Sequence, residues 1–247
     1  MNKTKIEWTD TTWNPVTGCN KISPGCTHCY AEKMASRLKL MGVSNYSDGF
    51  NVTLHPHMLS QPAEWKSPKM VFVCSMADLF HVKVPIGYIK RVFEVMNQST
   101  QHTFQVLTKR SDRLLELSSE LNWSANIWAG VSVENQDYAF RIDHLRKVPS
   151  QTRFISAEPL LGPLNLNLSG IHWLIAGGES GSQARPMEEK WVLEIRDQCI
   201  EQGTRFFFKQ WGGKNKKKAG RILDDRTWSE FPVNTDTGEV LDEDDTE

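Results

Sequence analysis

Short apolar runs alternate with amphipathic segments along most of this chain. The runs are rich in β-branched and aromatic residues, as buried strands are, and lie at 69–75, 103–108, 127–133, 152–157, 172–177 and 205–209. Apolar residues at helical spacing predict helices over 85–96, 112–121, 136–146 and 188–202. The stretch between the fourth and fifth runs is rich in Gly, Pro and Asn and predicts no helix.

This alternation predicts an α/β fold with a parallel sheet. Six to eight strands separated by helices favour closure into a full or partial β/α barrel in a single domain. With 247 residues, 39% of them hydrophobic, the chain has enough material for one such core. We assign residues 1–213 to this domain and residues 214–247, which hold a basic run and an acidic end, to a polar, charged tail.

The N-terminal part carries shorter elements. T-T-W-N-P-V, at 11–16, predicts a short first strand, and apolar residues at helical spacing predict a helix over 30–41. N-V-T-L-H-P-H, at 51–57, suggests a second short strand. His55 and His57 are spaced like a pair of metal ligands, but we interpret them as loop histidines fixed by Pro56.

Polar side chains follow each predicted strand at its end. In a β/α barrel the carboxyl ends of the strands share one mouth, where active sites form, so we expect these side chains to lie there. A single polar residue at a strand end is often only a cap, but six successive sets are harder to explain that way. The residues are Ser75, Asp78, Thr108, Lys109, Arg110, Ser132, Glu134, Asn135, Ser156, Glu158, Gly177, Gly178, Glu179, Ser180, Lys209 and Gln210.

Charge and targeting signals narrow the class of protein. The net charge of -1 and a pI near 6.7 exclude a global basic field for nucleic acid, so a polyanion would need a local patch. The N-terminus lacks the apolar core of a signal peptide, and no apolar run reaches the about eighteen residues of a membrane span. We therefore expect a cytoplasmic protein without membrane attachment.

Three of the five cysteines lie close together in a loop before the predicted helix at 30–41. Cys19, Cys26 and Cys29 have the spacing C-x6-C-x2-C, on a segment punctuated by Gly and Pro. Three soft sulfur ligands suit zinc, copper(I), an iron-sulfur cluster or redox chemistry. Clustered cysteines do not resemble the dispersed disulfide framework of a secreted protein. Cys74 and Cys199 are isolated, and we interpret them as small core residues.

The number of available ligands distinguishes the zinc, iron-sulfur and redox interpretations but excludes none of them. A structural zinc site needs a fourth ligand, which would have to be a histidine. The candidates are His28, His55, His57 and His81. A redox pair formed by Cys26 and Cys29 would leave Cys19 unexplained. A 4Fe-4S cluster held by three thiolates leaves one iron open, and an open metal position is typical of a catalytic site.

The cysteine loop and several later motifs resemble the radical S-adenosylmethionine enzymes. The chain is similar to a family of small proteins of this kind that is common in phages and prophages and distantly similar to spore photoproduct lyase. The usual cysteine spacing of these enzymes is C-x3-C-x2-C, from which this chain departs. The remaining motifs are S-M-A-D-L-F (75–80), L-T-K-R (107–110), G-V-S-V-E-N (130–135), S-A-E-P-L (156–160), G-G-E-S-G (177–181) and F-F-K-Q-W-G (207–212).

This resemblance implies a cofactor pair and a reaction type. Cys19, Cys26 and Cys29 would hold a 4Fe-4S cluster, whose open iron would bind S-adenosylmethionine and cleave it to a 5'-deoxyadenosyl radical. A flavodoxin- or ferredoxin-type reductant would supply the electron. The candidate cofactor-binding residues are His28, Tyr30, Ser75, Asp78, Lys109, Glu134, Glu158, Gly177, Gly178, Glu179 and Arg185.

The substrate is the least defined part of this prediction. We favour a nucleotide or a nucleic acid base, because the family is phage-associated and Trp and basic residues lie near the strand ends. A small metabolite or a peptide side chain is the alternative within the enzyme class. The alternative outside it is a zinc-stabilised nucleic-acid-binding module without catalysis.

Overall fold

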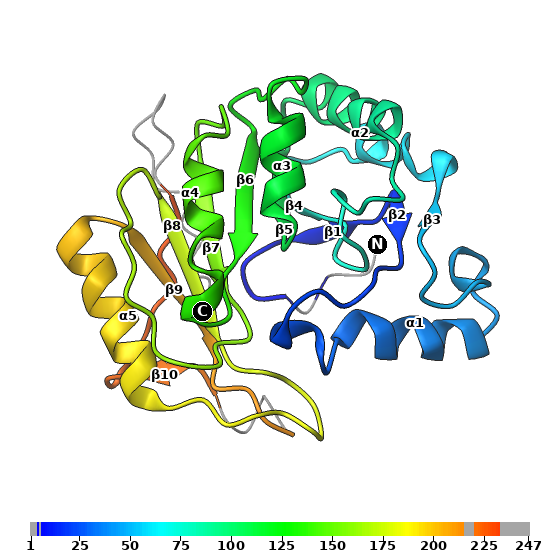
Figure 1. Cartoon of the computed structure of the whole chain (residues 1–247). Coiled ribbons are helices and arrows are strands. Elements are labelled where there is room, and N and C mark those ends of the chain that lie inside the picture. Colours follow the sequence, from blue (N-terminus) through cyan, green and yellow to red (C-terminus); the bar gives the residue numbers. More distant parts are fainter. Residues whose placement is uncertain (1–3, 5, 215–219, 233–247) are drawn as a thin grey trace. The chain divides into compact units, whose positions relative to one another are not determined.

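The computed structural model describes residues 4, 6–214 and 220–232. The chain divides into two compact units: Met1–Ser132 with Phe140–Gln151, and Val133–Ala139 with Thr152–Glu247. Each unit contains parallel strands and helices that alternate along the chain (Figure 1). The predicted α/β class with parallel strands is therefore confirmed.

The first unit is built on four parallel strands that neighbour one another in chain order. Their register aligns Phe72 with Gln105 and Gln105 with Trp128, with no shift between neighbours. Most positions on these strands are buried, as expected for a parallel sheet covered on both faces. The strands are β1 (Thr11–Trp13), β4 (Met70–Val73), β5 (Thr103–Thr108) and β6 (Ile127–Ser132).

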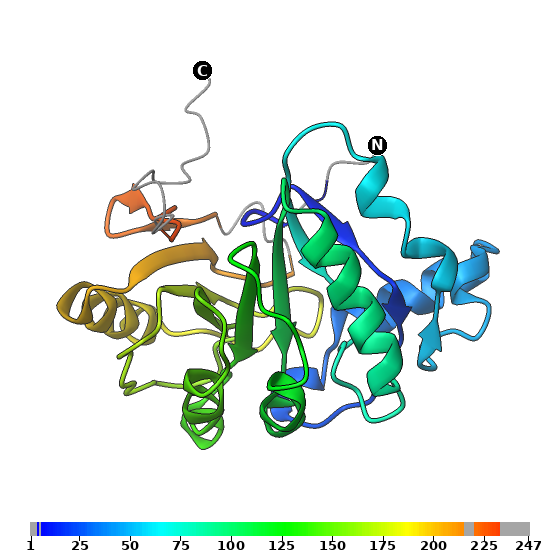
Figure 2. The same ribbon diagram turned by 90° about the horizontal axis from the view of Figure 1, so that it is seen from above.

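The helices of the first unit follow its strands. The helix that follows β4 is α2 (Ile86–Gln98), which starts directly after Pro85, whose fixed φ suits a helix start. Its buried face consists of Tyr88, Ile89, Val92, Phe93 and Met96. Figure 2 shows this helix alongside the strands of the unit. The helices are α1 (Tyr30–Leu40), α2 (Ile86–Gln98), α3 (Ser111–Ser118) and α4 (Arg141–Arg146).

Two predicted elements differ from the structure. The continuous helix over 136–146 is wrong: a short 3-10 turn, η5 (Gln136–Tyr138), precedes α4. The buried Arg141 guanidinium at the start of α4 donates to the Ser132 carbonyl at 2.8 Å, which fastens that helix to the end of β6. The short strand expected at 51–57 is β3 (Thr53–Leu54), and it pairs antiparallel with β2 (Val16–Thr17) outside the parallel sheet. Further 3-10 turns are η2 (Ser44–Tyr46), η3 (Pro56–Met58) and η4 (Gln61–Glu64).

The second unit is built on three parallel strands and one long helix. The strands are β7 (Arg153–Ala157), β8 (Trp173–Gly177) and β9 (Arg205–Gln210). Among the described residues no helix connects β7 to β8, as predicted. The helix α5 (Glu189–Gln202) precedes β9 and lies beside the strands in Figure 1. It ends at Gly203, whose φ of 71° is the left-handed conformation that glycine adopts most easily.

A hairpin lies beyond β9, within the region predicted as a tail. It consists of β10 (Ile222–Leu223) and β11 (Arg226–Thr227). The residues that follow it join β9 through hydrogen bonds from Phe208 N to Trp228 O and from Glu230 N to Phe206 O. The domain boundary at residue 213 stays a prediction, with this packed segment beyond it. Most of the basic run and the whole acidic end lie outside the described residues.

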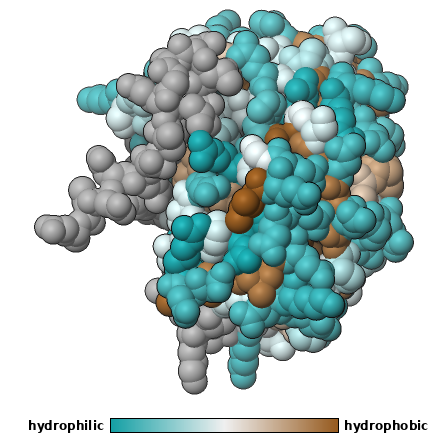
Figure 3. Space-filling model, turned by 90° about the vertical axis from the view of Figure 1, so that its left-hand side faces the viewer, coloured by the Kyte–Doolittle hydropathy of each residue, from teal (hydrophilic) through white to brown (hydrophobic). Residues whose placement is uncertain are grey.

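The described surface offers no membrane-spanning helix. None of the helices in the described part of the chain combines the length and the apolar character that a bilayer crossing requires. Figure 3, which faces the side that carries α5, shows a largely hydrophilic surface with small, separate hydrophobic areas. Ile200 on α5 and Ile222 on β10 are among the exposed large hydrophobic residues of the second unit.

Candidate functional site

The cysteine loop of the first unit runs from β2 to α1. It is anchored at Gly18, whose amide donates to Met76 O at 2.9 Å. Gly18 has a φ of +82°, and a Cβ atom there would lie 2.1 Å from Asn51 O, so only glycine fits. Past this anchor, the chain makes a 3-10 turn, η1 (Pro24–Cys26), and reaches Cys29, which is the N-cap residue of α1.

The three loop cysteines differ from the other two in exposure. Cys19, Cys26 and Cys29 are partly exposed free thiols, whereas Cys74 and Cys199 are buried free thiols, as predicted. Burial raises the pKa of the Cys19 thiol, and the nearby Asp78 carboxylate raises it further. The Arg110 guanidinium opposes both effects by a hydrogen bond and by its charge. Cys19 therefore lies next to both a carboxylate and a guanidinium.

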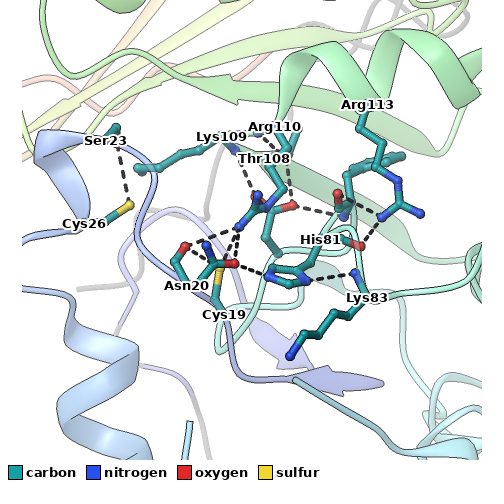
Figure 4. A network of polar contacts seen from close by, with 12 residues as sticks. Cys19, Asn20, Ser23, Cys26, His81, Lys83, Thr108, Lys109, Arg110 and Arg113 are labelled. Carbon is teal, nitrogen blue, oxygen red and sulfur yellow. Dashed lines mark hydrogen bonds and ion pairs between the residues drawn. The ribbon is translucent and has the colours of Figure 1, made fainter. Parts of the chain in front are cut away.

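The loop sulfurs do not form a finished metal site. Among residues 4, 6–214 and 220–232, no three or more His, Cys, Asp or Glu side chains are grouped so that they could hold a metal ion. Figure 4 shows the Cys19 sulfur beside Asn20 and Arg110, and the Cys26 sulfur turned toward Ser23, whose Oγ lies 3.6 Å away. The donor chemistry nevertheless suits an iron-sulfur cluster, because three thiols lie in one loop that leads into a helix N-terminus.

The histidines considered as a fourth zinc ligand have other partners. His55 Nε2 lies 2.8 Å from Thr17 Oγ1, and His57 Nε2 lies 3.1 Å from Asn45 Oδ1. His81 Nε2 contacts the Asn20 side chain, next to Cys19. His28 lies in the loop directly before Cys29. Of the candidates with a described partner, His81 contacts the residue beside a loop cysteine.

Asp78 joins the ends of β4 and β5 in the first unit. Its Oδ1 accepts from Thr108 Oγ1 at 2.7 Å and from Phe80 N at 3.0 Å, and its Oδ2 accepts from Lys109 N at 3.2 Å. Arg110 Nε lies 3.8 Å from the same Oδ2. The structure thus brings Asp78, Lys109 and Cys19 into one network through Arg110, and the Asp78 carboxylate is largely occupied by the chain itself.

The other predicted residues of the first unit lie on either side of this network. Ser75 donates to Asn14 Oδ1 at 3.2 Å, an oxygen that also accepts from Met76 N. This contact ties the loop after β4 to the segment after β1. Tyr30, the first residue of α1, is 64% exposed, so its ring is available to a ligand.

The second unit pairs its buried carboxylates with cations. Glu179 accepts from Arg185 three times, at its backbone amide (2.9 Å), its Nε (2.9 Å) and its Nη2 (2.6 Å). These bonds and the nearby buried Glu134 raise the pKa of Arg185. Lys209 Nζ lies 2.9 Å from Glu158 Oε1. The predicted residues of this unit therefore form two ion pairs, and a bound ligand would have to share or replace them.

The two glycines after β8 pack closely against the chain itself. A Cβ atom on Gly177 would lie 2.8 Å from Glu158 Oε1, so this glycine makes room for the carboxylate. A Cβ atom on Gly178 would lie 2.1 Å from Trp211 O, and Gly212 packs against it from the same segment. The close approach predicted for these glycines is thus made by the Glu158 carboxylate at Gly177 and by the backbone after β9 at Gly178. Whether a cofactor also contacts them stays a prediction.

Sequence reasoning missed Asn20. Its Oδ1 accepts from Arg110 Nη2 at 2.9 Å and contacts His81 Nε2, and its backbone carbonyl accepts from Arg110 Nη2 at 3.3 Å. An amide directly after the first loop cysteine is the only signal, and it has no meaning until β5 brings Arg110 to it. The surface hollows of about 610 and 740 Å³, lined by residues of 59–101 and 136–201, contain none of the predicted site residues.

The fold is similar to that of solved spore photoproduct lyase structures. One, a mutant with a dinucleoside spore photoproduct, has a TM-score of 0.51 at 11% identity, over 84% of this chain and 57% of that chain. Another mutant, with bound AdoMet and the same dinucleoside, has a TM-score of 0.47 at 12% identity, over 81% and 63%. The chain thus spans about three fifths of the length of these proteins. The first likeness shows that this chain shares an α/β fold with that protein, in agreement with the predicted fold class.

Sequence comparison places the chain in a family whose role is not defined. No curated protein matches it significantly. A family model described as a protein of unknown function, DUF5131, matches residues 3–232. This match includes the cysteine loop, both ion pairs and the hairpin after β9. The chain therefore belongs to the DUF5131 family of proteins of unknown function.

Proposed function

We propose that this protein is a radical S-adenosylmethionine enzyme in which Cys19, Cys26 and Cys29 hold a 4Fe-4S cluster. The observation that carries the proposal is the set of three partly exposed free thiols in one loop that leads into α1. Supporting it, the fold resembles that of spore photoproduct lyase. Binding a cluster would require the three sulfurs to come closer together, since they are not grouped as metal ligands in the described part of the chain.

The residues around the loop have distinct roles in this proposal. When bound, such a cluster supplies an electron that cleaves S-adenosylmethionine to methionine and a 5'-deoxyadenosyl radical. The N-terminal amides of α1 favour the negative charge that three thiolates bring to the site. His28, or Tyr30 in its place, would stack on the adenine. Buried apolar strands keep water from the reacting groups.

The polar strand ends supply further candidates for binding the cofactor, which are proposed for each unit by itself. They are Ser75, Asp78 and Lys109 in the first unit, and Glu134, Glu158, Glu179 and Arg185 in the second, with Gly177 and Gly178 at the end of β8. Glu179 would accept from the cofactor's ammonium or ribose hydroxyls. Because Arg185 already occupies this carboxylate, binding would exchange one hydrogen bond for another.

A nucleotide or a nucleic acid base is the proposed substrate. A spore photoproduct lyase of similar fold carries a dinucleoside. In this chain, Lys109, directly after β5, would supply positive charge for a phosphate. The phage association implied by the sequence motifs agrees with such a substrate. A flavodoxin- or ferredoxin-type protein would be the reductant, and we propose a cytoplasmic site of action.

Anaerobic reconstitution tests the proposal. The wild-type protein should turn brown and bind about four irons per chain. It should also release 5'-deoxyadenosine when it is reduced in the presence of S-adenosylmethionine. The Cys26→Ala variant should lose both iron and activity. The Cys199→Ala variant is the matched control, because Cys199 is buried in α5, and it should retain both. Retention of iron by the Cys26→Ala variant would contradict the ligand assignment.

The same experiment distinguishes the proposed enzyme from a zinc-binding protein without catalysis. A colourless protein with about one zinc per chain would indicate a zinc-stabilised nucleic-acid-binding module. Incubation with oligonucleotides, nucleosides and small metabolites, scored by 5'-deoxyadenosine release, then distinguishes the proposed substrate class from a metabolite or a peptide.

A further inference from the structure

Arg110 places a cation against the first cysteine of the loop. It is the N-cap residue of α3, two positions after the end of β5, and its side chain is only 13% exposed. The Nη2 atom lies 3.8 Å from Cys19 Sγ, within hydrogen-bond range for sulfur, and also donates to the backbone and side-chain oxygens of Asn20 (Figure 4). Little water screens this guanidinium, so its charge acts strongly on the neighbouring sulfur.

The nearest carboxylate, that of Asp78, does not form a close ion pair with the Arg110 guanidinium. Both oxygens of Asp78 accept hydrogen bonds from Thr108 and from the backbone of Phe80 and Lys109. Arg110 Nε approaches Asp78 Oδ2 only to 3.8 Å, and among the described residues it has no hydrogen-bond acceptor. Asp78 thus holds the guanidinium in place by charge, while Nη2 reaches toward the cysteine.

Asn20 fixes the geometry from the side of the loop. Its Oδ1 receives Arg110 Nη2 and His81 Nε2, and His81 Nδ1 accepts from Lys83 N at 3.1 Å. His81 therefore donates through Nε2, and it belongs to a segment that the Arg113 guanidinium ties down through the carbonyls of residues 80, 81 and 84. The residue next to Cys19 is held by these contacts before any ligand arrives.

We infer that Arg110 is a positioning residue that donates a hydrogen bond to the Cys19 thiolate and raises the reduction potential of the cluster this thiolate holds. The inference rests on the proposed function. Hydrogen bonds to ligand sulfurs and nearby positive charge stabilise the reduced, more negative state of an iron-sulfur cluster. Arg110 would supply both at one of the three ligands, and Asp78 would moderate the effect.

The test measures the midpoint potential of the cluster in the reconstituted protein by a reductive titration that is monitored by electron paramagnetic resonance. Arg110→Gln should retain its iron and titrate at a lower potential than wild type, and Arg110→Lys should recover part of the shift. Asp78→Asn should shift the potential upward, because it removes a negative charge beside the guanidinium. Arg91→Gln, on α2 and outside this network, is the control for loss of one positive charge and should titrate like wild type.

The possible outcomes separate the two proposals. A wild-type protein that binds no cluster would overturn the proposed function. A loaded wild type whose potential equals that of folded Arg110→Gln would overturn only this inference. So would a folded Arg110→Gln protein that takes up no iron, since Arg110 would then serve assembly. If thermal melting shows that Arg110→Gln does not fold, Asp78→Asn decides, and an unchanged or lower potential would overturn the inference.

Discussion

The cysteine loop of the first unit and the strand ends of the second unit use charged residues in opposite ways. In the second unit, the buried carboxylate of Glu179 is bound by three donors of Arg185, and Glu158 has Lys209 at 2.9 Å. In the first unit, the Asp78 carboxylate accepts hydrogen bonds from a hydroxyl group and from backbone amides. The Arg110 guanidinium contacts a cysteine sulfur rather than forming a close ion pair with Asp78.

This difference indicates which charges are matched by another charge within the chain and which are not. Closely bonded ion pairs satisfy each other, so a ligand at the second unit must compete with an existing partner. Arg110 Nε has no hydrogen-bond acceptor among the described residues, and this guanidinium lies beside a thiol, so it is stabilised when that thiol becomes a thiolate.

The largest expected effect concerns the anchor of the cysteine loop. Gly18→Ala should lower the free energy of unfolding by roughly 3 kcal/mol or more, because its Cβ would overlap Asn51 O at a positive φ. Gly42→Ala is the matched control, since Gly42 also has a positive φ but no atom within 4 Å of its Cβ position. It should cost about 1 kcal/mol. Equal urea midpoints for the two variants would show that the close approach at Gly18 is unimportant.

Next in size is the loss of the Glu179 carboxylate. Glu179→Gln should destabilise the protein by roughly 2 kcal/mol, a value reduced because the Arg185 side chain is 32% exposed. It should also weaken S-adenosylmethionine binding in the reconstituted protein while leaving the iron content unchanged. Calorimetric titration and an iron assay measure these effects. Unchanged affinity would remove Glu179 from the proposed site.

A smaller effect is expected at the second ion pair. Lys209→Met should cost about 1 kcal/mol, because Glu158 keeps the hydrogen bond that Ser156 Oγ donates to its Oε2 at 3.1 Å. The Lys190→Met variant provides the comparison, since the Lys190 side chain is 78% exposed and its 3.7 Å pair with Glu194 should contribute little. If both variants unfold at the same urea concentration as wild type, the Lys209 pair does not stabilise the second unit.

The smallest expected effect is a pH dependence. Burial, and to a lesser extent Arg153, lowers the pKa of His172, so the unfolded chain binds a proton more readily than the folded one. Stability should therefore fall as the pH drops through the unfolded value of about 6.5. His172→Asn, whose amide oxygen can replace the Nδ1 that accepts from Arg153 N, should flatten this dependence. Urea midpoints at several pH values measure it, and an unchanged slope would exclude His172 as a contributor.

Local sequence was sufficient for most of the individual elements. The strand over 103–108 matches β5, and the helices predicted over 30–41 and 188–202 match α1 and α5 to within a residue or so. These segments have a clear period and clear stops, so little depends on distant partners. The continuous helix over 136–146 was wrong, since α4 begins only at Arg141, whose side chain bonds to the end of β6, a contact that no local pattern contains.

The residues of the candidate site could be predicted from local sequence only in part. The cysteines stood out because three soft ligands in one loop are rare, and the strand-end residues followed from the rule for parallel sheets. The partners of these residues were not accessible. Asn20 and Arg110 are 90 positions apart in the chain but form a hydrogen bond in the fold, and Cys19 and Arg110 are 91 positions apart.

The sequence alone determined the α/β class, the order of strands and helices, and the loop that carries three of the five cysteines, because hydrophobic period and residue chemistry are local properties. Only the tertiary structure decided the contacts of the charged residues. The Asp78 carboxylate accepts hydrogen bonds from the chain itself, Glu179 and Glu158 pair with Arg185 and Lys209, and Arg110 lies beside Cys19. Those contacts depend on parallel pairing, which brings the ends of β4 and β5 side by side, and on the packing of the loops that follow them.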